Sequence, residues 1–392
     1  MPRFCVIPAV VLAALPLALP VAGQEVLEHK IPPGYQPEQE EDEKGLWLEV
    51  EEYEKAVRQS ALLVEDPDIN NYVDSIVCRV AGDYCRDFRV YVIRNPGFNA
   101  SMTPTGMMQV WTGLLLRAQT SDDVAAVIGH EIAHYTRLHS LERLRSVRKG
   151  MAAGTLFDLG LAVLTGVQSP LGQAAAMLNL LSFSRAQEQE ADLLGAQMVA
   201  EAAYDPHATY RIWENLLAEE EAAVIKREEP GLFSQTHPDA EDRAKLLEDW
   251  VTARYGPADA ELWASDRHLE FMNRNYLTLM ADQIDTNRFG RTQALLERHS
   301  AIGIEPALVH FFYGEMFRQR AQEGDDQRAI DAYRHSIEDG EPPPDSYKNL
   351  GYLYLKSGEN GLAQENFRHY LQLSPDASDR AMIEFYLEED DT

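Results

Sequence analysis

The sequence predicts a mostly helical α+β protein, with a small edge sheet in its first part and an α-solenoid in its last third. Three observations predict this class. Apolar residues recur at the spacing of amphipathic helices over most of the chain. Two short runs next to turn residues, at 89–93 and 107–111, are typical of strands. The last third repeats with a period of about 34 residues. The length of 392 residues suggests two domains, which we place at 45–258 and 270–392.

Composition and charge limit the partners. The formal net charge is −29 at pH 7. Proteins that bind nucleic acid place lysine and arginine against phosphate, so this charge excludes nucleic acid as a partner. Hydrophobic residues make up 45% of the chain, which is enough for packed cores.

The first 23 residues have the features of a secretory signal peptide. Arg3 supplies the positive start, residues 6–19 are apolar, and Val21-Ala22-Gly23 is a small-residue cleavage site. An uncleaved membrane anchor is the alternative, but the apolar run is short for a span. We therefore expect a periplasmic protein. Residues 24–44 are rich in proline and glutamate and predict an extended acidic leader outside the core.

Two helices and two strands are predicted next. The helices lie at 46–63 and 69–80, and the strands at 89–93 and 107–111. An oxidising compartment favours a disulfide between Cys78 and Cys85. In a straight helix their Cα atoms would be about 10.5 Å apart, beyond the ~7 Å limit, so the bond requires the second helix to end near Gly82. Two buried thiols are the alternative.

The following helix carries the motif His130-Glu131-Ile132-Ala133-His134. We expect it to start at Ser121 and to continue to about residue 149. Two histidines four residues apart share one face of a helix and reach one metal ion, and Zn²⁺ suits neutral nitrogens. Glu131 is placed to take a proton from water at the metal. A chance motif is the alternative, although polar residues inside a nearly all-apolar helix need a partner.

A second helix, predicted at 184–200, supplies the missing ligand. Glu188 and Asp192 are four residues apart and share one face of this helix. A catalytic zinc has three protein ligands, and we expect Glu188 to be the third. Asp192 is placed to accept the free N–H of a ligating histidine. Glu190 lies on another face, and we expect it to be solvated and without effect on the metal. The alternative is a solvated acidic face, common in a chain with 64 acidic residues.

Residues 151–183 form the most apolar stretch after the signal peptide. Asp158 and Pro170 argue against a membrane span. We favour a buried helical hairpin and keep open an element that contacts the membrane or acts as a lid. A further helix is predicted at 208–227, and His237 follows in a loop.

The last third matches the tetratricopeptide pattern. Ala329 and Ala363 are one period apart, and Gly314 and Gly351 occupy the small position of the preceding helix. A third, degenerate unit is suggested around Ala294. Generic helical hairpins are the alternative. Tetratricopeptide arrays form grooves that bind peptide or protein segments.

Together these segments resemble the HtpX and CAAX-prenyl-protease family of zinc peptidases, and within it the secreted, tetratricopeptide-bearing members of the periplasmic BepA type. The resemblance rests on Phe98-Asn99-Ala100, Gly113-Leu114-Leu115, the His130 to His134 motif, the stretch from Ser184-Arg185 to Asp192, and Thr236-His237-Pro238. It implies a gluzincin-type metallopeptidase domain with one Zn²⁺ per chain, held by His130, His134 and Glu188. The Gly-Gly usual in the family is Thr105-Gly106 here, and the repeat array is short for this type.

The resemblance implies an endopeptidase that degrades misfolded or stalled envelope and outer-membrane proteins. Its repeats would dock these proteins or the outer-membrane assembly machinery. The alternative is a tetratricopeptide chaperone or scaffold for outer-membrane protein assembly with a latent protease. An intact Glu131 favours the enzyme, because a scaffold has no need of it.

Three further roles are expected around the metal. His237 either fills the open zinc position as a gate, or stabilises the oxyanion, or only caps a helix or lies in solvent. Arg185 is the second candidate for the oxyanion. The substrate is expected to add as a strand along Met107, Met108, Gln109, Val110 and Trp111.

Overall fold

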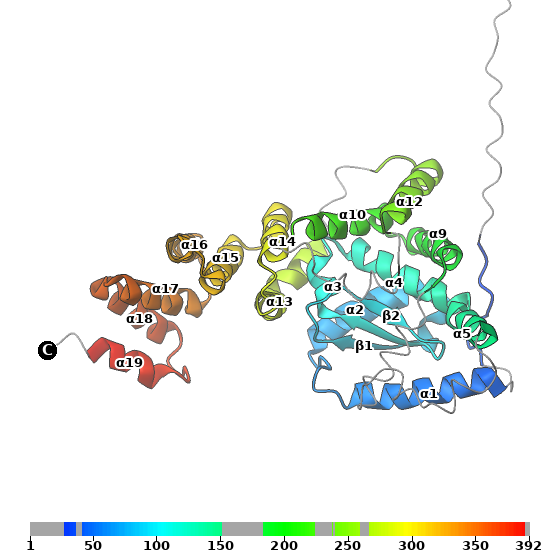
Figure 1. Cartoon of the computed structure of the whole chain (residues 1–392), viewed down its shortest axis with the longest axis horizontal. Coiled ribbons are helices and arrows are strands. Elements are labelled where there is room, and N and C mark those ends of the chain that lie inside the picture. Colours follow the sequence, from blue (N-terminus) through cyan, green and yellow to red (C-terminus); the bar gives the residue numbers. More distant parts are fainter. Residues whose placement is uncertain are drawn as a thin grey trace, which may run out of the picture.

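The computed structural model describes residues 27–36, 41–150, 183–223, 237, 240–258 and 266–388. Within these residues the protein is mostly helical, carries one three-stranded sheet and ends in a series of paired helices (Figure 1), which confirms the predicted fold class. The predicted signal peptide and, except for Phe183, the predicted apolar hairpin lie outside them. No helix in the described ranges combines the length and apolar character needed to cross a bilayer.

The elements of the first part are α1 (Glu41–Arg58), α2 (Pro67–Ala81), the 3-10 helix η1 (Gly82–Asp87), β1 (Arg89–Ile93), β2 (Ala100–Met102), β3 (Met107–Trp111), α3 (Thr112–Arg117), α4 (Ser121–Thr136), α5 (His139–Gly150), α9 (Arg185–Glu201), α10 (Ala208–Glu221) and α12 (Ala240–Tyr255). The C-terminal series consists of α13 (Asp266–Ile284), α14 (Phe289–Ile302), α15 (Pro306–Arg320), α16 (Asp325–Glu338), α17 (Pro344–Ser357), α18 (Asn360–Leu373) and α19 (Arg380–Glu388). Figure 1 shows this series extending away from the side of the first part that carries α3 and α10.

The sheet has the strand order β1-β3-β2, with β1 parallel and β2 antiparallel to β3. β1 and β3 coincide with the two predicted strands. β2 is not among them, because three residues are too few to show an alternation. On one face Tyr53 and Val57 of α1 pack against Ile93 and Met107, while Met108 points into the main core. The sheet therefore lies between α1 and α4 (Figure 1).

Residues 27–36 of the predicted leader contact the core, so the prediction that the leader at 24–44 lies outside it is wrong for this described part. Ile31 is 4% exposed and packs in the main core. The Tyr84 hydroxyl donates to its carbonyl, and the Lys30 N–H donates to the Thr136 carbonyl at the end of α4. The few apolar residues of this segment stand apart from one another among prolines and charged residues and show no periodicity, so no sequence pattern indicates this contact.

The helix predicted at 46–63 is α1, but its bounds differ. It begins at Glu41 within the acidic stretch and ends at Arg58. The chain then turns, Leu63 bridges to Ile93, and the Val64 N–H donates to the Val92 carbonyl. These contacts cover part of the outer edge of β1 and give the backbone after α1 its partners.

α2 ends where the predicted disulfide requires it to end. Gly82 follows α2 with a φ of 55°, a conformation that glycine adopts without strain. The chain then enters η1, which brings the Cα atoms of Cys78 and Cys85 to 4.6 Å, and their sulfur atoms are bonded.

The single helix predicted from Ser121 to about residue 149 is two helices. α4 starts with a capping box, in which Thr120 and Asp123 exchange hydrogen bonds. It ends at Thr136, and Leu138 has a φ of 58°, which a right-handed helix cannot contain. α5 then begins at His139, whose ring turns back toward α4.

The paired helices interlock through glycines. A Cβ on Gly314 would approach the ring of Tyr333 to 2.4 Å, and one on Gly351 would approach Phe367 to 2.6 Å. These small and aromatic residues belong to the pattern that predicts the repeats. The tetratricopeptide assignment itself stays a prediction.

Candidate metal centre

α4 places the histidine motif in the interior of the protein. His130, Glu131 and His134 are each at most 5% exposed. Because the histidines are four residues apart, their rings lie on one face, and their Nε2 atoms are 3.0 Å apart. A cation between the two nitrogens would bind both lone pairs.

α9 crosses α4 at two glycines. A Cβ on Gly195 would lie 2.8 Å from the backbone nitrogen of His130, and one on Gly129 would lie 3.0 Å from the Gly195 carbonyl oxygen. The two backbones therefore touch, and Glu188, two turns before Gly195, reaches the motif. Its carboxylate oxygens lie 3.6 Å from Nε2 of His130 and 3.6 Å from Nε2 of His134.

Asp192 lies behind His130. Its Oδ1 is 3.0 Å from Nδ1 of His130, so the carboxylate accepts that N–H and leaves the Nε2 lone pair facing the cluster. One turn of α9 separates Asp192 from Glu188, so one helix supplies a ligand-type group and a group that orients a ligand.

His237 brings a fourth buried donor. Its Nδ1 is 3.0 Å from Oε1 of Glu188 and 3.2 Å from Nε2 of His130. Its Nε2 is 3.5 Å from Oε1 of Glu131. At 3% exposure it does not lie in solvent, which removes that alternative.

The donor set fits Zn²⁺. One ligand atom from each of His130, His134, Glu188 and His237 lies within 4.8 Å of the others. In the described part of the chain Oε1 of Glu131 is buried without a hydrogen-bond partner. A buried acceptor in this state is costly unless a further group binds there. Imidazole nitrogens and one carboxylate are ligands that zinc takes in proteins.

Burial sets the charge state of these groups. It lowers the pKa of His130, and it lowers the pKa of His134 well below its ordinary value, so both rings are neutral and free to bind a metal. Burial raises the pKa of Glu131 to about 7, which suits a residue that takes up and returns a proton near neutral pH. For Glu188 burial acts against the charge, but His237 and then Arg243 hold its pKa below the ordinary value.

Arg243 of α12 is a buried part of the site that the sequence analysis missed. Its Nε and Nη2 donate to the two Asp192 oxygens at 2.8 and 2.6 Å, and its Nη1 lies 2.8 Å from Oε2 of Glu188. The guanidinium lies over the Trp213 ring. The sequence does carry a signal for the burial of Arg243. It is four residues before Leu247 and so lies on the apolar stripe of its helix.

One expectation about α9 is wrong, and another stays a prediction. Arg185 is exposed at the start of the helix, outside the buried cluster, and its role at the oxyanion stays a prediction. Glu190 is not a plain solvated acid, because its Oε2 accepts hydrogen bonds from Arg137 and lies 3.2 Å from Nε2 of His139. Helical spacing puts Glu190 on a different face from Glu188, but it does not say what that face meets.

The expectation of a substrate strand along Met107, Met108, Gln109, Val110 and Trp111 is also wrong. These residues are β3, which pairs with β1 on one side and with β2 on the other. Both rows of backbone groups are therefore already used, and no strand can be added. The sequence shows that a run is a strand but not its place in the sheet order.

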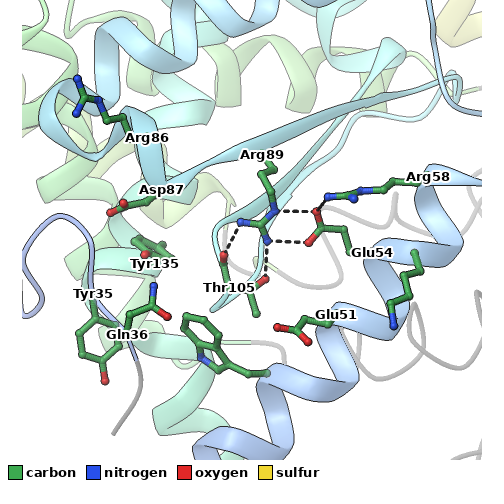
Figure 2. Close-up of a pocket in the computed structure, with 12 residues that line it drawn as sticks. Tyr35, Gln36, Glu51, Glu54, Arg58, Arg86, Asp87, Arg89, Thr105 and Tyr135 are labelled. Atoms are coloured by element: carbon green, nitrogen blue, oxygen red, sulfur yellow. Dashed lines mark hydrogen bonds and ion pairs between the residues drawn. The ribbon is translucent and has the colours of Figure 1, made fainter.

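A surface cavity of about 430 Å³ lies between α1, β1 and the leader, apart from the metal cluster. Glu54, Arg89 and Arg58 meet on its wall (Figure 2). Arg89 binds both Glu54 oxygens at 2.7 Å. Burial opposes the charge of Glu54, but its hydrogen bonds with Arg89 and others lower its pKa to about 2. These charges bind one another and tie α1 to the sheet.

The fold and the site define a class of protein. A mostly helical domain with a small sheet, in which one helix supplies His-Glu-x-x-His and a second supplies a glutamate, is typical of zinc metallopeptidases. Residues 64–251 match the sequence profile of peptidase family M48. This part of the chain is therefore similar to the zinc metallopeptidases of that family.

Two curated relatives of the chain carry different names. The chain is 33% identical over 187 residues to mitochondrial metalloendopeptidase OMA1 of Schizosaccharomyces pombe, covering 46% of this chain and 52% of that protein. It is 28% identical over 217 residues to the beta-barrel assembly-enhancing protease of Escherichia coli, covering 51% and 44%. The chain thus spans about half the length of the curated relatives it matches. The identities are too similar to favour one name over the other.

Proposed function

We propose that this chain is a zinc-dependent endopeptidase. One observation carries the proposal: His130, His134 and Glu188 converge in a buried cluster, with Glu131 beside them. The three would hold one Zn²⁺, which when bound acidifies water and polarises a carbonyl group. Glu131 takes a proton from the attacking water and passes it to the amine nitrogen that leaves as the peptide bond breaks.

Among the described residues β2 is an outer strand of the sheet, and we propose its outer edge as the binding place of the substrate chain. The Asn99 carbonyl and the Thr103 N–H bond to β3. Ala100 and Met102 therefore direct their backbone groups to the opposite side. On that side the Met102 N–H hydrogen-bonds the Glu131 carboxylate. A peptide added antiparallel or parallel to this edge would pass next to the proton-transferring glutamate.

The substrates we propose are misfolded or stalled envelope proteins, met in the periplasm. The predicted signal peptide and the predicted Cys78 and Cys85 pair support an oxidising compartment. The C-terminal series of paired helices supports a docking module for protein segments. A relative named for beta-barrel assembly supports the outer-membrane part of the proposal.

One observation favours a second candidate, a tetratricopeptide chaperone or scaffold with a latent protease. Every donor of the metal cluster is buried, and His237 lies among the other three. A site closed in this way needs a change of conformation before a substrate can enter. The scaffold would work through the paired helices alone.

Two variants test the proposed function. Glu188→Ala should lose Zn²⁺ and activity, whereas Glu131→Gln should keep Zn²⁺ and the fold but not cleave an unfolded protein. Gln189→Ala, exposed on the same helix, is the control. Metal analysis that finds equal zinc in the Glu188→Ala and control proteins would reject the ligand assignment. Full cellular function of Glu131→Gln would favour the scaffold.

A further inference from the structure

The outer nitrogens of the two motif histidines have different partners. Nδ1 of His130 meets the Asp192 carboxylate. Nδ1 of His134 meets another imidazole, with Nδ1 of His139 at 2.9 Å. His139 is fully buried, so water cannot take over this contact. The outer nitrogen of His134 therefore has a neutral imidazole as its hydrogen-bond partner, whereas that of His130 has a charged carboxylate.

The positions of protons along this contact follow from the proposed metal site. His134 would bind the metal through Nε2, so its Nδ1 carries the hydrogen. The hydrogen bond then requires Nδ1 of His139 to be an acceptor. A neutral imidazole has one donor and one acceptor nitrogen, so Nε2 of His139 must carry its proton. A group that accepts from this Nε2–H fixes that tautomer.

Glu190 is the acceptor. Its Oε2 lies 3.2 Å from Nε2 of His139. Arg137 holds the same oxygen with Nε at 3.0 Å and Nη2 at 2.9 Å. A third nitrogen of Arg137 donates to the Glu28 carbonyl of the leader at 2.7 Å. The carboxylate is thus held in place from both sides, although its side chain is 39% exposed.

The backbone also supports this arrangement. Leu138, with a φ of 58°, is in the left-handed region, which residues other than glycine rarely adopt. This break between α4 and α5 turns His139 back against the ring of His134. A continuous helix would place His139 about 140° around the axis from His134, away from the metal.

We propose that His139 is a positioning residue for the metal ligand His134, and that Glu190 acts through it by holding the tautomer in which Nδ1 accepts. The proposal rests on the proposed metal site. His139 and Glu190 touch neither the metal position nor the substrate edge. They orient the imidazole and keep its Nε2 lone pair directed at the cluster, as carboxylates do for metal-bound histidines elsewhere.

The test is the rate at which a chelator removes zinc from the purified, zinc-loaded protein. His139→Leu deletes the acceptor and should release zinc about 10-fold faster. His139→Asn places an amide oxygen where Nδ1 lies and should recover most of this loss. Glu190→Ala should release zinc several-fold faster, about 3-fold or more. Gln189→Ala is the control, and thermal unfolding of the zinc-free proteins shows whether each variant folds.

The double variant separates positioning from a general loss of stability. If Glu190 acts only through His139, then His139→Leu with Glu190→Ala releases zinc no faster than His139→Leu alone. Additive effects in the double variant, or wild-type release from both single variants, would overturn the proposal. Wild-type protein that binds no zinc would instead overturn the proposed function, and this inference with it.

Discussion

His237 lies between the metal cluster and the proton-transferring glutamate. Its Nδ1 is 3.0 Å from Glu188 and 3.2 Å from His130. Catalytic zinc needs one position without a protein ligand. We expect His237 to fill that position and hold the enzyme latent. If it does so in about 90% of molecules, then His237→Ala raises the rate of cleavage about 10-fold.

The rate of cleavage of an unfolded protein, together with self-cleavage on a gel, measures this effect. His369→Ala, an exposed histidine of α18, is the control. A large loss of activity would assign His237 to the oxyanion instead. An unchanged rate would remove it from the mechanism.

At the scale of elements, the crossing of α4 and α9 brings the ligands together. Gly195→Ala adds a Cβ that would lie 2.8 Å from the His130 backbone nitrogen, and backbone atoms cannot rotate away. The helices must separate, which moves Glu188 from the histidines. We expect the free energy of unfolding to fall by about 1–3 kcal/mol and zinc to bind more weakly.

The measurements are denaturant unfolding and zinc content after dialysis. Gly361→Ala is the matched control, because a Cβ at that helical glycine meets nothing within 4 Å. Equal zinc and equal stability in the Gly195→Ala protein would show that the crossing tolerates wider spacing, and the close approach would then not explain the site.

At the scale of the whole molecule, two buried histidines join the C-terminal series to the first part. His268 of α13 donates from Nε2 to the Ala118 carbonyl and accepts from the Tyr72 hydroxyl. His299 of α14 donates from Nε2 to the Leu116 carbonyl. These bonds cap the end of α3, so the first helix pair of the series packs directly on the first part.

These histidines make the joined structure sensitive to acid. Burial lowers the pKa of His268 to about 4 and of His299 to about 3. Because both values lie below the unfolded value of about 6.5, the stability they contribute is fully present above pH 6.5 and is lost as the pH falls toward 4. At pH 5.5 the need to keep each of these histidines neutral lowers the free energy of unfolding by about 1.4 kcal/mol.

Denaturant unfolding at pH 7.5 and 5.5 measures this loss. In the His268→Gln protein the fall in unfolding free energy between pH 7.5 and 5.5 should be about 1.4 kcal/mol smaller than in the wild type, because glutamine does not titrate. His369→Gln is the exposed control. The same loss in the His268→Gln and wild-type proteins would contradict the prediction.

The sequence by itself determined the local parts. The spacing of His130 and His134, with Glu131 between them, follows from one helical turn, and Glu188 and Asp192 follow from another. β1 and β3 follow from composition, and the end of α2 follows from Gly82. Each of these depends on residues within about four positions of one another, so periodicity is enough to find them.

Only the tertiary structure decided which faces meet. It placed β3 between β1 and β2, kept Arg185 out of the cluster, and brought in Arg243. It also connected Glu190 to His134 through His139. Periodicity shows which residues share a face, but a hydrogen bond between distant segments depends on how two elements cross. Here that crossing is set by close approach at Gly129 and Gly195 and by a break at Leu138, which no repeat in the sequence records.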